Sequence, residues 1–66
     1  MRTQSELEAA LHSLGWEVDG PKRTAAGWKA TIRRGTLSIL ATGPTPEQVL
    51  EVLLRDAQER ARRDQR

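Results

Sequence analysis

Few residues of this chain have side chains that could do acid–base, nucleophilic or metal chemistry. His12 is the only imidazole, and cysteine is absent, which excludes disulfides and thiolate metal sites. A catalytic base needs a partner that orients it, and no serine–aspartate or cysteine set surrounds His12 in the sequence. One histidine also falls short of the usual zinc ligand sets. We therefore predict a solvated surface histidine, and we expect no catalytic residue, metal, cofactor or small-molecule ligand.

The segment ahead of the second predicted helix has a layout that can bind phosphate. It reads TGPTPEQ over residues 42–48, and the free N–H groups of a helix start attract anions. Here Thr45 and Gln48 form a capping box that satisfies such donors, and Pro46 has no N–H. Glu47 adds a carboxylate at the positive end of the helix dipole. The segment is therefore predicted to be a helix entrance and not an anion site.

Two sets of side chains remain as candidate binding surfaces. The first set is basic and could contact the phosphates of a nucleic acid without reading its sequence; it comprises Lys22, Arg23, Lys29, Arg33 and Arg34. Against this interpretation, Glu17 and Asp19 are expected on the same outer face, which has no aromatic side chain for stacking bases. The default is a charged rim that keeps the hairpin soluble. The second set lies outside or at the margin of the apolar stripes and favours a protein partner or self-association; it comprises Leu40, Val49 and Val52.

Composition limits the chain to one small domain, expected over residues 1–66. No run approaches the roughly 20 apolar residues that span a bilayer, so no membrane partner is expected. Eleven Lys and Arg against nine Asp and Glu give a net charge of +2, a weak field for a nucleic-acid module. Most of these bases are arginine, which is typical of a GC-rich bacterial or phage genome. The N-terminus is polar and lacks the apolar core of a signal peptide, so a cytoplasmic protein is expected.

Local patterns predict one helix and one short strand in the first third of the chain. Thr3 and Glu6 form a capping box, and apolar residues at helical spacing follow, which predicts a helix over residues 4–14. Residues 16–19 alternate apolar and charged side chains, as in a strand. Turn chemistry at Asp19-Gly20-Pro21 is expected to end this strand, and residues 22–27 are predicted to form a loop.

The strongest pattern is a hairpin between residues 28 and 42. A two-residue turn at Arg34-Gly35 would place apolar residues opposite one another on one face: Ile32 with Leu37, Ala30 with Ile39, and Trp28 with Ala41. A slip of one residue would destroy this match. The sequence therefore predicts a hairpin with one buried face.

A second amphipathic helix is predicted from Pro46 onward. Its apolar stripe comprises Leu50, Leu53, Leu54, Ala57 and Ala61. Favourable i,i+4 ion pairs are expected between Glu51 and Arg55, Asp56 and Arg60, and Glu59 and Arg63. Past Ala61 no apolar residue remains to anchor the chain, so residues from about 62 to 66 are expected to fray.

Together these elements predict an α+β fold with the order α-β-β-β-α. A three-stranded antiparallel sheet with two helices on one face would bury every apolar stripe. The predicted core comprises Leu7, Leu11, Leu14, Trp16, Val18, Trp28, Ala30, Ile32, Leu37, Ile39, Leu50, Leu53 and Ala57.

The element order at this length resembles the double-stranded-RNA-binding-domain fold. Residues 5–7 and 14–18 (Ser-Glu-Leu and Leu-Gly-Trp-Glu-Val) are similar to the first helix and strand of HicA-type toxins, RNA-cleaving proteins of that architecture. Residues 43–51 resemble a Gly-x-Thr-Pro-Glu-Glu-Ala-Leu-Glu segment of HicB-type antitoxins, much of which helix capping explains by itself. The resemblance implies RNA cleavage, RNA binding or binding to a protein partner.

Two departures bear on those activities. HicA-type toxins have a catalytic histidine at the start of the second strand, where this chain reads Ala-Gly-Trp-Lys over residues 26–29. Double-stranded-RNA-binding domains have a lysine cluster at the start of the last helix, where this chain reads Pro-Glu-Gln-Val-Leu over residues 46–50. Both activities lose their principal residues.

These observations favour a small non-enzymatic interaction protein, of an accessory or phage type, that contacts another protein or a second copy of itself. The alternative is a weak, sequence-nonspecific nucleic-acid-binding protein with the double-stranded-RNA-binding fold. A ribonuclease related to the HicA-type toxins is a third interpretation, and it needs a catalytic residue that the sequence does not supply.

Overall fold

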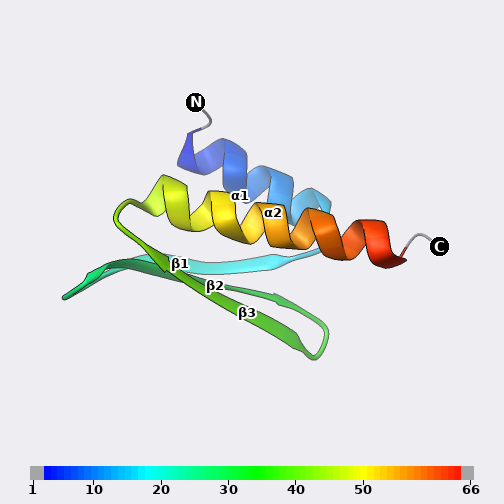
Figure 1. Ribbon diagram of the computed structural model, residues 1–66. Coiled ribbons are helices and arrows are strands. Elements are labelled where there is room, and N and C mark those ends of the chain that lie inside the picture. Colours follow the sequence, from blue (N-terminus) through cyan, green and yellow to red (C-terminus); the bar gives the residue numbers. More distant parts are fainter. Residues whose placement is uncertain (1–2, 65–66) are drawn as a thin grey trace.

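Two helices cover one face of a three-stranded antiparallel sheet in the computed structural model, which describes residues 3–64 (Figure 1). The elements are α1 (Gln4–Ser13), β1 (Glu17–Thr24), β2 (Gly27–Arg34), β3 (Leu37–Gly43) and α2 (Pro46–Asp64). The strand order β1-β2-β3 leaves β1 and β3 as the two edges of the sheet. The predicted α+β class and α-β-β-β-α order are confirmed.

Both helices begin at the threonine caps predicted from the sequence. The Thr3 hydroxyl accepts a hydrogen bond from the Glu6 N–H at 3.3 Å, and the Thr45 hydroxyl accepts one from the Gln48 N–H at 3.2 Å. Each bond satisfies an N–H that a helix start leaves without an intrahelical partner. α2 continues to Asp64, past the point where fraying was expected, and residues 65–66 of the predicted tail lie outside the described part of the chain.

The core lies between the helices and β2. Its buried side chains are Leu7, Leu11, Trp16, Ala30, Ile32, Val49, Leu50, Leu53, Leu54 and Ala57. Leu14, Val18, Trp28 and Ile39 are partly buried against it, as members of the predicted core. Leu37 was predicted to be core and is 44% exposed, because it lies beside the β2–β3 turn at the end of the hairpin.

β1 is twice as long as predicted, and the prediction of a loop over residues 22–27 is wrong. The strand continues through the cis Gly20–Pro21 peptide bond, and its register with β2 shifts between Asp19 and Lys22. Lys22 then lies opposite Lys29, and Thr24 opposite Gly27. Pairing with β2 supplies partners for backbone groups that a loop would leave to solvent, and here it outweighs local turn chemistry.

The β2–β3 register differs from the prediction by two residues. Gly35 and Thr36 form the turn, so that Arg34 lies opposite Leu37 and Ile32 lies opposite Ile39. Gly35 has a φ of 62° and Thr36 has no positive φ, which is the sign pattern of a type II′ turn with glycine first. Since side chains alternate with a period of two, a two-residue shift keeps the same side chains on the same face.

Candidate interaction surface

The five basic residues proposed for nucleic-acid contact do not form one patch. Lys22, Lys29 and Arg33 lie on the side of the sheet away from the helices. Arg23 and Arg34 lie on the helix-facing side, because each pairs with a residue of that side. The candidate basic set is therefore divided between the two sides of the sheet. The period-two alternation of strands divides consecutive residues such as Arg33 and Arg34 between opposite sides.

Arg34 closes one end of the core. Its guanidinium carbon lies 5.4 Å from the centroid of the Trp16 ring, within the range of a cation–π interaction. Trp16 is only 1% exposed, and its indole Nε1 finds no hydrogen-bond partner among the described residues. Arg34 itself is half-buried. This arginine has a packing role that its sequence context did not reveal.

We call the helix-free side of the sheet the outer face. It carries Glu17, Asp19 and Lys22 from β1, Lys29, Thr31 and Arg33 from β2, and Ser38, Leu40 and Thr42 from β3. Arg33 lies directly opposite Glu17, and a shallow depression joins these two residues with Asp19. Carboxylates therefore accompany this arginine, as expected from the sequence. The two lysines, in contrast, lie opposite each other across β1 and β2, a like-charge arrangement that destabilises a sheet.

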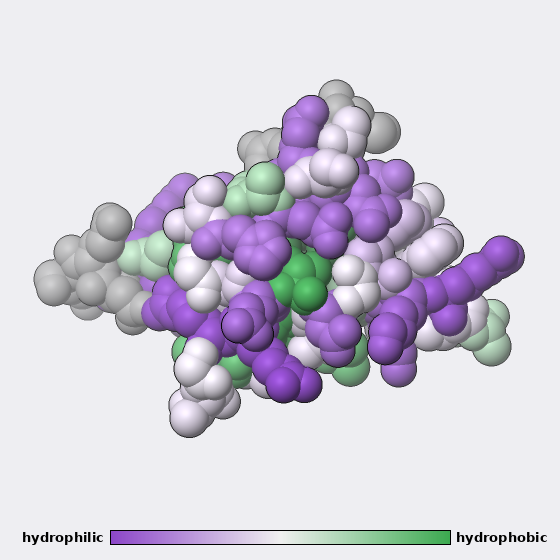
Figure 2. Space-filling model, turned by 180° about the vertical axis from the view of Figure 1, so that it is seen from behind, coloured by the Kyte–Doolittle hydropathy of each residue, from purple (hydrophilic) through white to green (hydrophobic). Residues whose placement is uncertain are grey.

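The three apolar candidates separate into two exposed residues and one core residue. Leu40 is 62% exposed on the outer face, and Val52 is 56% exposed on α2, as predicted. Val49 is fully buried, so its assignment to an interface is wrong. One methyl carbon of Val49 lies 3.2 Å from the position that a Cβ on Gly43 would take, which shows how closely the start of α2 packs on the end of β3. The side of the molecule opposite to the view of Figure 1 is mostly hydrophilic, with a small hydrophobic area near its middle and further hydrophobic atoms along its lower edge (Figure 2).

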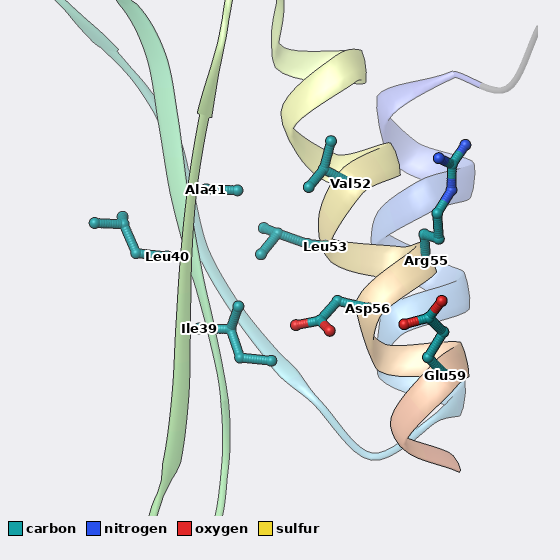
Figure 3. Close-up of a pocket in the computed structure, with 8 residues that line it drawn as sticks. All are labelled: Ile39, Leu40, Ala41, Val52, Leu53, Arg55, Asp56 and Glu59. Carbon is teal, nitrogen blue, oxygen red and sulfur yellow. The ribbon is translucent and has the colours of Figure 1, made fainter. Parts of the chain in front are cut away.

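A groove of about 320 Å³ runs between β3 and α2. Ile39 and Ala41 point from β3 toward α2, Leu53 points back toward the sheet, and Leu40 points to the opposite side (Figure 3). The helix side of the groove also carries Val52 and three charged residues, Arg55, Asp56 and Glu59. Of the predicted i,i+4 pairs, the structure shows the one between Asp56 and Arg60, with 3.6 Å between a carboxylate oxygen and Nε. The groove thus has an apolar floor and a rim with both signs of charge.

The two edges of the sheet differ sharply in how they are protected. β1 carries four charged residues, Pro21 and the register shift beside it, all of which are devices that discourage pairing with another strand. β3 reads Leu-Ser-Ile-Leu-Ala-Thr-Gly, with no charge and no proline. It is a regular strand, paired residue for residue with β2. The free side of β3, which we call the β3 edge, is therefore competent to accept another strand.

No family model, curated protein or solved structure matches this chain. The resemblance to double-stranded-RNA-binding domains and HicA-type toxins stays a prediction. His12 is exposed in the last turn of α1, and the helix entrance at Thr45 has its capping bond in place. Across residues 3–64 no cluster of three or more His, Asp or Glu is arranged to hold a metal ion. Neither helix in this range is long and apolar enough to cross a membrane.

Sequence reasoning found Leu40 and missed the edge to which it belongs. Ser38 and Thr42 share the outer face with Leu40 and complete its uncharged strand. A signal was present, since residues 35–46 contain no charged residue in a chain that is 30% charged. A charge-free strand at the end of a sheet order is the feature that marks an unprotected edge.

Proposed function

We propose that this chain is a small non-enzymatic interaction protein that binds a protein partner by strand addition at the β3 edge. One observation carries the proposal: β3 is a regular, charge-free edge strand, whereas β1 is protected by charges, Pro21 and a register shift. In strand addition the backbone hydrogen bonds supply affinity, and alternate side chains supply specificity. The composition, free of cysteine, fits a reducing compartment such as the cytoplasm.

The side chains beside the β3 edge indicate what the incoming strand would contact. On the outer face it would meet Leu40, and on the other side it would meet Ile39, Ala41 and the exposed Val52 of α2. A strand with apolar residues at alternate positions would cover these side chains on both faces. Loss of apolar exposure would then add to the hydrogen bonds of the new ladder.

The positions where a catalytic residue would be expected support the non-enzymatic part of the proposal. His12, the one imidazole, lies exposed on α1, which among residues 3–64 contacts α2 and β1 and not β3. The start of β2, where the resemblance would require a catalytic histidine, reads Gly-Trp-Lys. Trp28 there is half-buried against the core.

Affinity capture with matched variants tests this function. A tagged chain and its Ala9→Lys control, which adds a charge on the exposed surface of α1, should retain the same protein partner. Leu40→Lys adds that charge at the centre of the β3 edge and should abolish retention while circular dichroism shows an unchanged fold. Equal retention by Leu40→Lys and Ala9→Lys, or no specific partner and no self-association, would refute the proposal.

A second candidate function rests on the outer face. Lys22 and Lys29 lie opposite each other, and a polyanion would relieve their repulsion. This candidate predicts that duplex RNA is retarded in a gel at low salt and that the shift fades steeply with added salt. Lys22→Glu with Lys29→Glu should remove the shift, whereas Arg23→Glu, on the other side of the sheet, should retain it. A shift that depends equally on Arg23 would place binding elsewhere.

A further inference from the structure

We infer that the occupant of the β3 edge is a second copy of this chain, joined through antiparallel β3–β3 pairing about a two-fold axis at Leu40. The inference rests on the proposed function and names its partner. It joins two sheets of the order β1-β2-β3 into one six-stranded sheet, with both pairs of helices on the same side. A symmetric, self-complementary contact of this kind is the commonest form of protein assembly.

The direction of the free backbone groups follows from the β2–β3 hairpin. In a hairpin with a two-residue turn the flanking pair, Arg34 and Leu37, is hydrogen-bonded, and bonded and non-bonded pairs then alternate. The N–H and C=O groups of alternate β3 residues starting at Leu37 therefore face β2. Those of Ser38, Leu40 and Thr42 face the β3 edge, where a second strand would need them.

One two-fold register uses all of these groups and matches side chains by type. With Leu40 opposite Leu40 of the second copy, Ser38 lies opposite Thr42, and every one of the three residues belongs to a hydrogen-bonded pair. Leucine meets leucine and hydroxyl meets hydroxyl on the outer face, which are stabilising cross-strand combinations. On the other face Ile39 lies opposite Ala41, so both faces of the new pair remain uncharged.

Neighbouring registers fit less well. An axis at Ile39 would place Leu40 opposite Ser38, and it would place Thr42 opposite Thr36, which belongs to the turn. An axis at Ala41 would place Ser38 opposite Pro44, which has no N–H to donate. Only the axis at Leu40 keeps the pairing within residues 38–42.

The helix beside the groove is compatible with a second copy. Val52 is exposed there next to Ile39 and Ala41, and Arg55 shares the rim with Asp56 and Glu59 (Figure 3). The two-fold axis at Leu40 makes the second α2 antiparallel to the first. Charged residues of the rim on one copy can then lie near residues of opposite charge on the other copy. A rim of one sign would repel its own copy.

Sedimentation of the purified chain gives the first test. The wild-type protein should sediment with twice the chain mass of 7.4 kDa at high concentration and dissociate on dilution. Leu40→Lys replaces a leucine pair with two opposed ammonium groups and should raise the dimer dissociation constant by roughly tenfold or more. Ala9→Lys carries the same added charge on α1 and should leave the constant unchanged.

Single cysteines test the register, since the natural chain has none. Opposite residues of a hydrogen-bonded antiparallel pair have Cα atoms about 5.5 Å apart, within disulfide range. Leu40→Cys should therefore cross-link to itself under mild oxidation. Ser38→Cys should cross-link with Thr42→Cys in a mixture and not with itself, because four residues of strand separate the two copies of position 38 along the sheet.

The outcomes separate this inference from the function on which it rests. A purified chain that stays monomeric to about 1 mM, or a dimer indifferent to Leu40→Lys, would overturn the inference. If such a monomer still captures another protein in a Leu40-dependent way, the proposed function stands and only the second copy is excluded. If neither association depends on Leu40, both fail. Self-cross-linking of Ser38→Cys as fast as that of Leu40→Cys would overturn the register.

Discussion

Replacing Arg34 should destabilise the protein, although its sequence position favours an exposed charge. The guanidinium lies 5.4 Å from the Trp16 ring, and an interaction of this kind contributes about 0.5–1 kcal/mol when exposed and about 2 when desolvated. Because Arg34 is half-buried, we expect about 1 kcal/mol from the charge. The aliphatic stem covers Gly15 and the end of the core, with Cδ 3.7 Å from the position that a Cβ on Gly15 would take, and its loss adds to this cost.

We therefore expect Arg34→Ala to lower the free energy of unfolding by about 1–2 kcal/mol, or roughly 4–8 °C in Tm for each kcal/mol in a domain of this size. Arg34→Met keeps much of the stem and should lose about half as much. Urea unfolding followed by far-ultraviolet circular dichroism measures both. Arg33→Ala is the matched control, since Arg33 is exposed on the outer face, and it should change stability by less than about 0.5 kcal/mol. Equal losses for Arg33→Ala and Arg34→Ala, or no loss for either, would refute the assignment.

Three further substitutions test the packing around β3 and α2 by the same unfolding measurement. Gly27→Ala should lower the free energy of unfolding by at least about 2 kcal/mol. Gly27 has a φ of 139°, and a Cβ there would lie 2.6 Å from the carbonyl oxygen of Gly43. Wild-type stability of this variant would contradict the close approach. Thr45→Ala should cost about 1 kcal/mol by removing the cap of α2, and Thr45→Ser should restore most of it. Val49→Ala should lower the free energy of unfolding by roughly 2 kcal/mol, whereas Val52→Ala should change it by less than about 0.5 kcal/mol. Equal losses would contradict the burial of Val49 and the exposure of Val52.

Helix starts were predictable because capping is a local matter. Thr3 and Thr45 each satisfy an N–H three residues ahead, and the sequence displays both partners. The faces of the hairpin were predictable for a similar reason, since alternation assigns Ala30 and Ile32 to one side without reference to the rest of the fold.

Register and strand length depended on contacts that local sequence does not contain. The apolar pattern is unchanged by a two-residue shift, so only the preference of Gly35 for the first position of the turn distinguishes the two alignments. Likewise, β1 passes through Gly20-Pro21 because β2 supplies a partner beyond it. The position of Val49 was uncertain by its angle on the helical wheel, and the close packing of α2 on Gly43 decides it.

Only part of the candidate surface could be predicted, because the rest depends on how the strands pair. Exposure of Leu40 follows from alternation. The separation of Arg33 from Arg34 needs the β2–β3 register that keeps Arg34 in the strand, and that of Lys22 from Arg23 needs the extended β1. An unprotected edge is a property of the assembled sheet. The absence of charge from residues 35–46 becomes informative only once β3 is known to be outermost.

The protection of β1 also sets the size of any assembly that β3 can make. A subunit with one competent edge has a valence of one, so it can join a single neighbour and then present only blocked edges to others. Association through β3 therefore stops at a dimer. Rising protein concentration should increase the fraction of dimer without producing fibrils. Straightening β1 by replacing Pro21 and removing the extra residue at the register shift would raise the valence to two, and the same sheet would then be free to polymerise.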